Sequence, residues 1–299
     1  MRVAVVVASS KPGWSTRRLV EALRRRGHRA ALVDIREAWL RVGEKVEVRY
    51  RGARLDPDVV VVRSLGSSLN VEQLMARLAL LAGLEEAGVP VVNPWLGILY
   101  ARNKALTALL LRRAGLSTPE SVLAESLGPL LRFTREQREV VVKPLSGSLG
   151  LGSYRVRDTD TMFHVASLLL DLSRPVYAQR FIERRGGGDI RAFIVGGRLV
   201  AAAERLPPPG GWKTNIAQGG RARRVELSGE EEAAAIRAAE ALGLLYAGVD
   251  MARGLDGRLY IFEVNAMPNW LGLYRATGID PAEEIARLLE RVAKRGGDE

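Results

Sequence analysis

Two acidic residues near the C-terminus stand at the ends of neighbouring apolar runs. Asp250 ends the run Ala247-Gly-Val, and Glu263 and Asn265 end the run Tyr260-Ile-Phe. If the runs are adjacent strands, Glu263 and Asn265 point to the same side, because they are two residues apart. A buried carboxylate is costly unless it is paired or bound to a cation, and three oxygen donors suit Mg²⁺. The pattern predicts a magnesium site, and a carboxylate paired with arginine is the simpler alternative.

A glycine-rich loop supplies a second signal. Ser146 to Gly152 (SGSLGLG) follows an apolar run that ends in Lys143 and Pro144. Glycines allow backbone N–H groups to surround an anion, and a lysine adds a point charge for phosphate oxygens. The loop is neither a Walker loop nor a dinucleotide fingerprint. A glycine-rich hairpin without a ligand is the alternative.

Charged residues between these two signals form a third group. Asp189 and Arg191 open one β-type run, Arg205 closes the next run, and the segment 212–215 (WKTN) follows in a loop. Each of these is typical of a solvated surface pair when taken alone. Together they would place guanidinium groups, a lysine and an amide beside the proposed metal and phosphate sites.

The composition excludes several other chemistries. The 299 residues contain no cysteine, which removes disulfides, thiol nucleophiles and thiolate zinc sites, and His28 and His164 are too few for a histidine metal cluster. Of the 45 basic residues only six are lysine, and the net charge is +11. This excess indicates either a polyanionic partner or a compositional bias of the source.

No targeting or membrane segment is evident in the sequence. Met1 and Arg2 lead directly into a valine run without a cleavable signal pattern, and no stretch of about 18 uncharged apolar residues follows. We expect a cytoplasmic protein with no membrane association.

Periodicity predicts alternating strands and helices in the first third and mixed elements afterwards. The expected strands and hairpins lie at residues 2–8, 30–34, 45–55, 58–63, 89–93, 140–144, 176–182, 190–195, 198–205, 246–252 and 259–264. The expected helices lie at residues 16–26, 71–86, 95–114, 160–171, 230–242 and 281–294. The length suits two or three packed units.

These signals occur in an order that resembles the ATP-grasp superfamily, and within it the RimK-like glutamate ligases. The matching stretches are NKALT (103–107), VVVKPLSGSLGLG, AQRFIE, GGDIRAFIVGGRLVAAAER, WKTNIAQGG, YAGVDMARG and FEVNAMPNWLGLYRATGID. The WKTNIAQGG and NAMPNWLGL stretches look most like archaeal members that add glutamate to a pterin cofactor.

The resemblance implies a three-domain ATP-grasp fold that combines α/β and α+β units. The expected domains are a pre-ATP-grasp unit at residues 1–94, a central unit at 95–175 and a C-terminal unit at 176–299, with ATP held between the last two. The implied nucleotide-binding residues are Lys104, Lys143, Ser146, Gly147, Gly150, Gly152, Gln179, Arg180, Phe181, Glu183, Asp189, Lys213, Thr214 and Asn215.

Roles carry over from the family position by position. Lys104 and Lys143 would hold phosphates under the flap 146–152, Arg180 and Phe181 would contact adenine through backbone groups, and Asp189 would bind ribose. The segment from Lys213 to Asn215 would reach toward the phosphates. The implied Mg²⁺ ligands, with Mn²⁺ as an alternative ion, are Asp250, Glu263 and Asn265. The implied catalytic residues, which stabilise the charge of an acyl phosphate, are Arg191 and Arg205.

Two positions depart from the family pattern. Gln179-Arg180 stands where the family commonly has Gln-Glu, which removes the side-chain role of that Glu but not the backbone contacts. Lys213 stands where the ribosomal-protein modifiers have an arginine, which keeps the charge and loses the bidentate fork.

The implied activity is ATP-dependent ligation of L-glutamate to an acidic small molecule, such as a pterin- or folate-like cofactor, through an acyl phosphate. The alternatives are a ligase that modifies a protein C-terminus (a ribosomal protein or an amino-group carrier protein), a nucleic-acid-binding protein and a degenerate ATP-grasp scaffold. A nucleic-acid partner is not expected, because few aromatic residues accompany the arginine run 24–26. A homo-oligomer, either a dimer or a tetramer, is expected.

The basic residues divide into two groups under this interpretation. Three of the six lysines fall on proposed phosphate positions, whereas Arg24 to Arg26 and the pair Arg184-Arg185 are interpreted as surface residues. The acceptor pocket is expected in the N-terminal unit, where Val62 to Gly66 and Asn93-Pro94 are candidate motifs.

Overall fold

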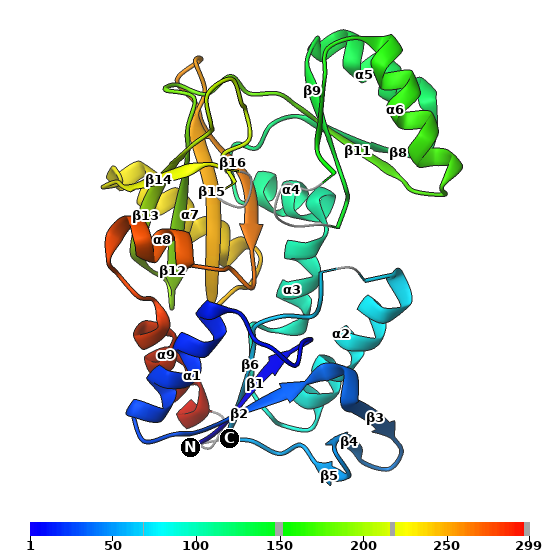
Figure 1. The fold of residues 1–299 in the computed structure, drawn as a ribbon. Helices are drawn as coiled ribbons and strands as arrows, with labels where there is room; N and C mark the ends of the chain where they lie inside the picture. The colour runs from blue at the N-terminus through cyan, green and yellow to red at the C-terminus, as the bar shows by residue number, and fades with distance from the viewer. Residues whose placement is uncertain (68, 147–151, 216–218, 296–299) are drawn as a thin grey trace.

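The computed structural model of the protein describes residues 1–67, 69–146, 152–215 and 219–295 (Figure 1). The described strands form three main sheets and one small sheet. No helix in these ranges is long and apolar enough to cross a membrane.

The N-terminal unit is built on a parallel sheet with the strand order β2-β1-β6-β7. Its strands are β1 (Arg2–Val7), β2 (Arg29–Asp34), β6 (Val59–Val62) and β7 (Val91–Val92). Helix α1 (Trp14–Arg25) packs on one face and α2 (Val71–Glu86) on the other, which explains why β1 and β6 are valine-rich throughout. A 3₁₀ turn (Ile35–Glu37) leads to a small antiparallel sheet of β3 (Ala38–Val42), β4 (Val46–Tyr50) and β5 (Ala53–Arg54).

The helical stretch expected over 95–114 forms two helices, α3 (Trp95–Arg102) and α4 (Lys104–Arg113). Asn103 separates them, and its side-chain oxygen accepts hydrogen bonds from the N–H groups of Ala105 and Leu106, each at 3.1 Å. Asn103 is therefore the N-cap of α4, which begins at Lys104.

The central unit is an antiparallel sheet with the order β10-β9-β11-β8, covered by two helices. Its elements are β8 (Ser121–Ala124), α5 (Leu127–Gln137), β9 (Val140–Lys143), β10 (Tyr154–Val156), α6 (Thr159–Asp171) and β11 (Val176–Arg180). The expected division at residue 175 places β11 in the C-terminal unit, whereas the strand pairs with β9 and β8. The central sheet thus continues five residues beyond that division.

The C-terminal unit is an antiparallel sheet with the order β14-β13-β12-β15-β16. Its elements are β12 (Asp189–Val195), β13 (Arg198–Leu206), β14 (Arg221–Arg224), α7 (Gly229–Ala241), β15 (Tyr246–Arg253), β16 (Leu259–Asn265), α8 (Leu271–Thr277) and α9 (Ala282–Arg295). Helix α7 packs against β12, β15 and β16, and α9 packs against α1 of the N-terminal unit.

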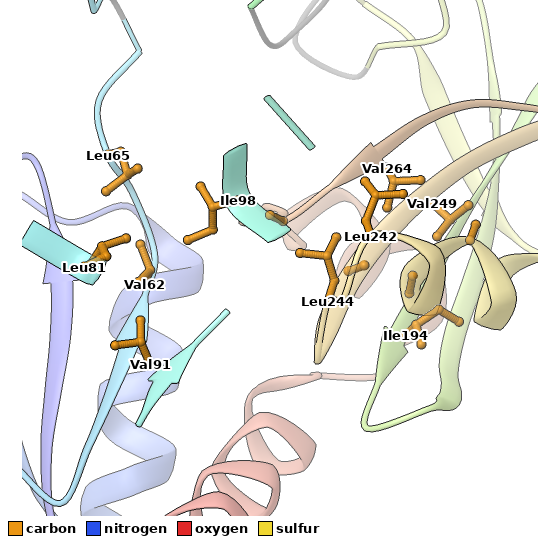
Figure 2. Close-up of a cluster of buried hydrophobic side chains, with 14 of the residues drawn as sticks. Val62, Leu65, Leu81, Val91, Ile98, Ile194, Leu242, Leu244, Val249 and Val264 are labelled. Carbon is orange, nitrogen blue, oxygen red and sulfur yellow. The ribbon is translucent and has the colours of Figure 1, made fainter. Parts of the chain in front are cut away.

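Two of the three hydrophobic cores are shared between the N-terminal and C-terminal units. One joins Val62 and Leu81 to Leu244 and Val264, with Ile98 of α3 between the two groups (Figure 2). The other joins β1 and α1 to α9 and Trp270. The central unit buries a core of its own, which includes Leu130 and Phe133.

Polar contacts reinforce this union at the ends of β6 and β7. The buried Asn93 donates to the carbonyl oxygens of Tyr246 (2.8 Å) and Ala266 (2.7 Å), and it accepts from the N–H groups of Leu245 and Tyr246. Arg63 donates to the carbonyl oxygen of Pro268 at 2.8 Å. We call Asn93 and Arg63 the interdomain clamp, because both hold C-terminal backbone against the N-terminal sheet.

Candidate active site

A cavity opens between the central sheet and the C-terminal sheet. The space between its walls, including the open mouth, is about 890 Å³. Twelve of the residues predicted from sequence line it: Lys104, Lys143, Gln179, Arg180, Phe181, Asp189, Arg205, Lys213, Thr214, Asn215, Asp250 and Glu263.

The central wall of the cavity is formed by β9, β11 and the start of α4. Lys143 is the last residue of β9, and its Nζ donates to Oε1 of Gln179 on β11 at 2.7 Å. Burial lowers the pKa of Lys143 to about 8, although Glu263 across the cavity opposes this shift. The second lysine, Lys104, stands at the first residue of α4, and its charge lowers the pKa of Lys143 further. The described lining residues of this wall include no carboxylate.

Arg180 and Phe181 end β11 at the edge of the cavity. The Arg180 N–H donates to the Glu120 carbonyl at 2.8 Å, and the Phe181 N–H donates to the Glu139 carbonyl at 2.9 Å. These two N–H groups are therefore already used within the protein. A backbone contact of these residues with a base would be made by their carbonyl oxygens.

The C-terminal wall carries a network of paired charges. Arg205 on β13 donates to both oxygens of Asp189 on β12, at 2.7 and 2.9 Å, and reaches Oδ2 of Asp250 on β15 at 3.0 Å. Arg191 on β12 also bonds both carboxylate oxygens of Asp250. Asp189, Arg205 and Asp250 are all buried, so the network is a compensated set of charges in a low-dielectric site.

The electrostatics of this network follow from the pairing. Burial alone would raise the pKa of Asp250, but the guanidinium groups of Arg191 and Arg205 outweigh it and hold the pKa below its ordinary value. Burial would likewise lower the pKa of Arg205, but Asp250 and Asp189 raise it instead. Asp250 and Arg205 therefore stay charged at neutral pH.

The three predicted metal ligands lie on the paired strands β15 and β16, and of these Asp250 and Glu263 line the cavity. Asp250 lies opposite Glu263, and Asn265 lies opposite Gly248. The register shifts between Asp250 and Met251, which leaves Phe262 as an extra residue on β16, and a bulge of this kind turns side chains toward a site. Phe262 and Glu263 consequently line the cavity together.

Comparison with known proteins identifies the chain. The model of the RimK-like ATP-grasp domain matches residues 101–289, and that of the RimK PreATP-grasp domain matches residues 1–98. The chain belongs to the RimK-like ATP-grasp family. It is therefore an ATP-grasp ligase, and the expected family, fold class and enzyme class are confirmed.

The matches to individual relatives cover nearly the whole of this RimK-like chain. The probable alpha-L-glutamate ligase of Halorhodospira halophila is 34% identical over 99% of this chain and 97% of its own length. The probable alpha-L-glutamate ligase of Nitrosococcus oceani is 32% identical over 99% of this chain and 97% of its own length. A structure of the ATP-grasp ligase PsnB complexed with minimal precursor superposes with a TM-score of 0.76 at 23% identity, covering 97% of this chain and 98% of that one. A RimK domain protein from Sphaerobacter thermophilus superposes with a TM-score of 0.72 at 23% identity. The match covers 97% of this chain and 100% of that one.

Several predicted residues, Asn265 among them, are not among the described residues that line the cavity of this RimK-like ligase. Arg191 stands behind Asp250, and Glu183 is exposed. Ser146 and Gly152 flank the glycine loop, and Gly152 has a φ of +70°, a conformation that favours glycine. Gly147 and Gly150 lie outside the described residues.

Two residues that depart from the family pattern have defined contacts. Arg180 donates to the Tyr260 hydroxyl at 2.8 Å, so this side chain ties β11 to β16 where the family commonly has a glutamate. Lys213 lines the cavity, with its Nζ 5.3 Å from the centre of the Trp212 ring.

Sequence reasoning missed Arg184, which it interpreted as a surface residue. The structure corrects this interpretation, because the Arg184 side chain is only 11% exposed and lines the cavity. It donates to the Trp212 carbonyl and lies 3.6 Å from Oδ2 of Asp189. The Trp212 ring meets Phe181 edge to face at 6.1 Å between centroids, and both residues line the cavity. An adjacent pair of arginines offers no local signal that only the first is buried.

Proposed function

We propose that the RimK-like ligase joins L-glutamate, through its amine, to a carboxylate of an acidic small molecule such as a pterin- or folate-like cofactor, at the expense of ATP. The observation that carries the proposal is the cavity, in which lysines on one wall face a charge-paired network on the other. The names of relatives about one third identical to this chain support glutamate as the added amino acid.

The nucleotide is proposed to lie between the two walls. Lys104, Lys143 and Lys213 would contact its phosphates, and the carbonyl groups of Arg180 and Phe181 would face the adenine. Asp189 already accepts two hydrogen bonds from Arg205 and one from the Thr214 hydroxyl, the last at 2.5 Å. A carboxylate has about four lone-pair sites, which leaves room for one ribose hydroxyl.

The proposed metal donors fit Mg²⁺ in their chemistry. Nδ2 of Asn265 donates to the Gly248 carbonyl at 3.4 Å, which leaves Oδ1 as the acceptor end of the amide. Glu263 lies partly buried on the cavity surface, and Asp250 is shared with the two arginines. Bound Mg²⁺ would neutralise phosphate charge, and Mn²⁺ offers similar coordination.

The reaction follows from these positions. A carboxylate oxygen of the acceptor attacks the γ-phosphorus of ATP, which releases ADP and forms an acyl phosphate. The glutamate amine then attacks the acyl carbon, forms the amide, loses a proton and displaces inorganic phosphate. Arg205 and Arg191, which are held in place by Asp250 and Asp189, would stabilise the negative charge that develops in both steps.

The test supplies the purified enzyme with ATP, Mg²⁺ and radiolabelled glutamate, together with either a low-molecular-weight metabolite extract or purified protein fractions. We expect ADP-coupled label in small molecules, and a Glu263→Gln variant should incorporate none. Label found only in macromolecules would replace the small-molecule acceptor with a protein C-terminus. ADP release with other amino acids but not with glutamate would overturn the glutamate assignment. The proposed cytoplasmic location and the dimeric or tetrameric state are tested by fractionation and light scattering.

A further inference from the structure

A second group of cations lies outside the nucleotide cavity, at the carboxyl edge of the N-terminal sheet. Arg36 follows β2, Arg77 lies on α2, and Arg102 ends α3. We call these three residues the arginine cluster. Helices α2 and α3 pack against each other, and α3 leads directly to α4 (Figure 1).

The contacts of Arg77 bring the cluster to the segment that follows β6. Its Nη1 donates to the Leu65 carbonyl, and a Cβ atom added at Gly66 would lie 2.8 Å from the same nitrogen. Arg77 thus packs directly on the backbone of the motif Val62 to Gly66. Ligands of parallel α/β sheets bind outside the carboxyl ends of the strands, which is where this motif lies.

The cluster carries more positive than negative charge. Arg36 is paired with Asp34, with 2.6 Å between Nη2 and Oδ2. Within the described parts of the chain, neither Arg77 nor Arg102 has a carboxylate within ion-pair distance. Three guanidinium groups and one carboxylate leave an excess of two positive charges.

Part of this excess positive charge is buried. Nε of Arg102 is buried and has no hydrogen-bond partner in the described structure. Burial, and then the charge of Arg77, lower the pKa of Arg102. Burial also lowers the pKa of Arg77, Arg36 adds to that effect, and Asp34 opposes it. A buried cation without a counter-charge is unfavourable, so an anion bound here would be strongly stabilised.

The position of the cluster connects it to the nucleotide site. Arg102 precedes Lys104 by two residues, and Lys104 lines the cavity. An anionic molecule held at the carboxyl edge of the N-terminal sheet can therefore extend along the α3–α4 junction toward the proposed phosphates. Arginine favours carboxylate and phosphate groups, because its planar fork makes two parallel hydrogen bonds.

We propose that Arg77 and Arg102, with Arg36 beside them, bind carboxylate groups of the acceptor that do not react, and so orient its reacting carboxylate toward the nucleotide cavity. The assignment rests on the proposed function for the identity of the acceptor. The ligand class is a small molecule or peptide with two or more carboxylates. Free phosphate is the competing source of the same anionic chemistry.

The experiment measures binding directly and needs no turnover. Tri-L-glutamate is titrated into the full-length enzyme by calorimetry, with and without a non-hydrolysable ATP analogue, and Arg77→Gln and Arg102→Gln are compared with Arg113→Gln, an exposed arginine of α4. We expect each cluster variant to weaken tri-L-glutamate binding by about 10- to 100-fold, with unchanged affinity for the ATP analogue and no effect of Arg113→Gln.

Other outcomes overturn the assignment. It fails if tri-L-glutamate does not bind the wild-type enzyme, or if it binds the cluster variants as tightly. Competition by inorganic phosphate at equal or lower concentration would assign the cluster to phosphate instead. If Arg77→Gln does not fold, Arg102→Lys keeps the charge and removes the fork, and it should still weaken binding. Because the ATP-coupled transfer of glutamate is measured separately, failure here leaves the proposed function standing.

Discussion

The two walls of the proposed nucleotide cavity neutralise their charges in different ways. On the C-terminal wall, Arg191 and Arg205 are each bonded to buried carboxylates. On the central wall, Lys143 donates to the neutral amide of Gln179, and burial lowers its pKa to about 8. The C-terminal wall is organised by its own ion pairs, whereas we expect a bound anion to add counter-charge beside Lys143 on the central wall.

The difference separates two tasks within one site. Groups that are fixed by their own pairing can stabilise charge in a transition state without reorganisation. A partly buried cation facing an amide instead binds an anion strongly, because the anion supplies the missing charge. We therefore expect substitutions on the C-terminal wall to affect turnover, and substitutions on the central wall to affect nucleotide affinity.

The largest effect is expected for Asp250→Asn. The change leaves Arg191 without its carboxylate partner and Arg205 with Asp189 alone, and turnover at saturating ATP should fall by at least about 1,000-fold. Breaking a buried ion pair should also lower the free energy of unfolding by about 3–5 kcal/mol. Steady-state kinetics and denaturant unfolding measure both, with Glu204→Gln as the control, since Glu204 forms an ion pair with the exposed Arg223. Turnover within tenfold of the wild type would contradict a preorganised C-terminal wall.

Lys143→Met should produce the next largest effect. The variant removes the cation of the central wall while keeping the length of the side chain, so the dissociation constant of ATP should rise by about 10- to 100-fold. Turnover at saturating ATP should change less than affinity. Calorimetric titration tests this, and the exposed Lys45→Met is the matched control. A fall in turnover with unchanged ATP affinity would place the two walls in the opposite roles.

The pH dependence of ATP binding should identify the same lysine. Lys143 is charged below its pKa of about 8 and becomes neutral above it, so ATP affinity should fall as the pH rises from 7 to 9.5. Deprotonation of the triphosphate adds negative charge and would strengthen its attraction to a cation, so it does not account for a fall in affinity. Isothermal titration calorimetry without metal should show the ATP affinity falling by up to about tenfold per pH unit above about pH 8. The affinity should not fall below that of Lys143→Met. An equally steep profile in Lys143→Met would assign the dependence to another group.

Thr214→Val should have the smallest effect. The hydroxyl group of Thr214 donates to Asp189, whose carboxylate Arg205 also holds, so its loss should lower the free energy of unfolding by about 1 kcal/mol. Turnover should stay within a few-fold of the wild type. Urea unfolding measures the first quantity, and Thr214→Ser should restore it. A loss of turnover as large as that of Asp250→Asn would show that the network is less self-sufficient than its ion pairs indicate.

Much of the fold could be predicted from local patterns. The helix expected over residues 71–86 forms as α2, and the strands expected near residues 246 and 259 form as β15 and β16. These elements have long apolar runs or helical spacing. Helix α5 was not predicted, and its Pro129 lies in the first turn, where proline is tolerated.

The remainder depends on contacts that local patterns do not encode. The apolar run 176–180 pairs with β8 and β9 rather than with the strands that follow it, because strand pairing is decided by the whole sheet. The resemblance to the RimK-like ligases, carried over position by position, pointed to twelve of the residues that line the cavity. Arg184 was missed, because its burial results from Asp189 and Trp212, which are distant in space until the chain folds.

The interdomain clamp and the two shared cores have a consequence for the divergence of this family. The first 98 residues bury Val62 and Leu81 in the same core as Leu244 and Val264, and Asn93 satisfies backbone groups of β15. Excised alone, this segment would expose apolar surface and leave those groups unpaired. New acceptor preferences are consequently expected to arise by substitutions at the carboxyl edge of the N-terminal sheet, not by exchange of the whole segment. Chimaeras joined near residue 98 should aggregate unless the C-terminal residues that face the segment are exchanged as well.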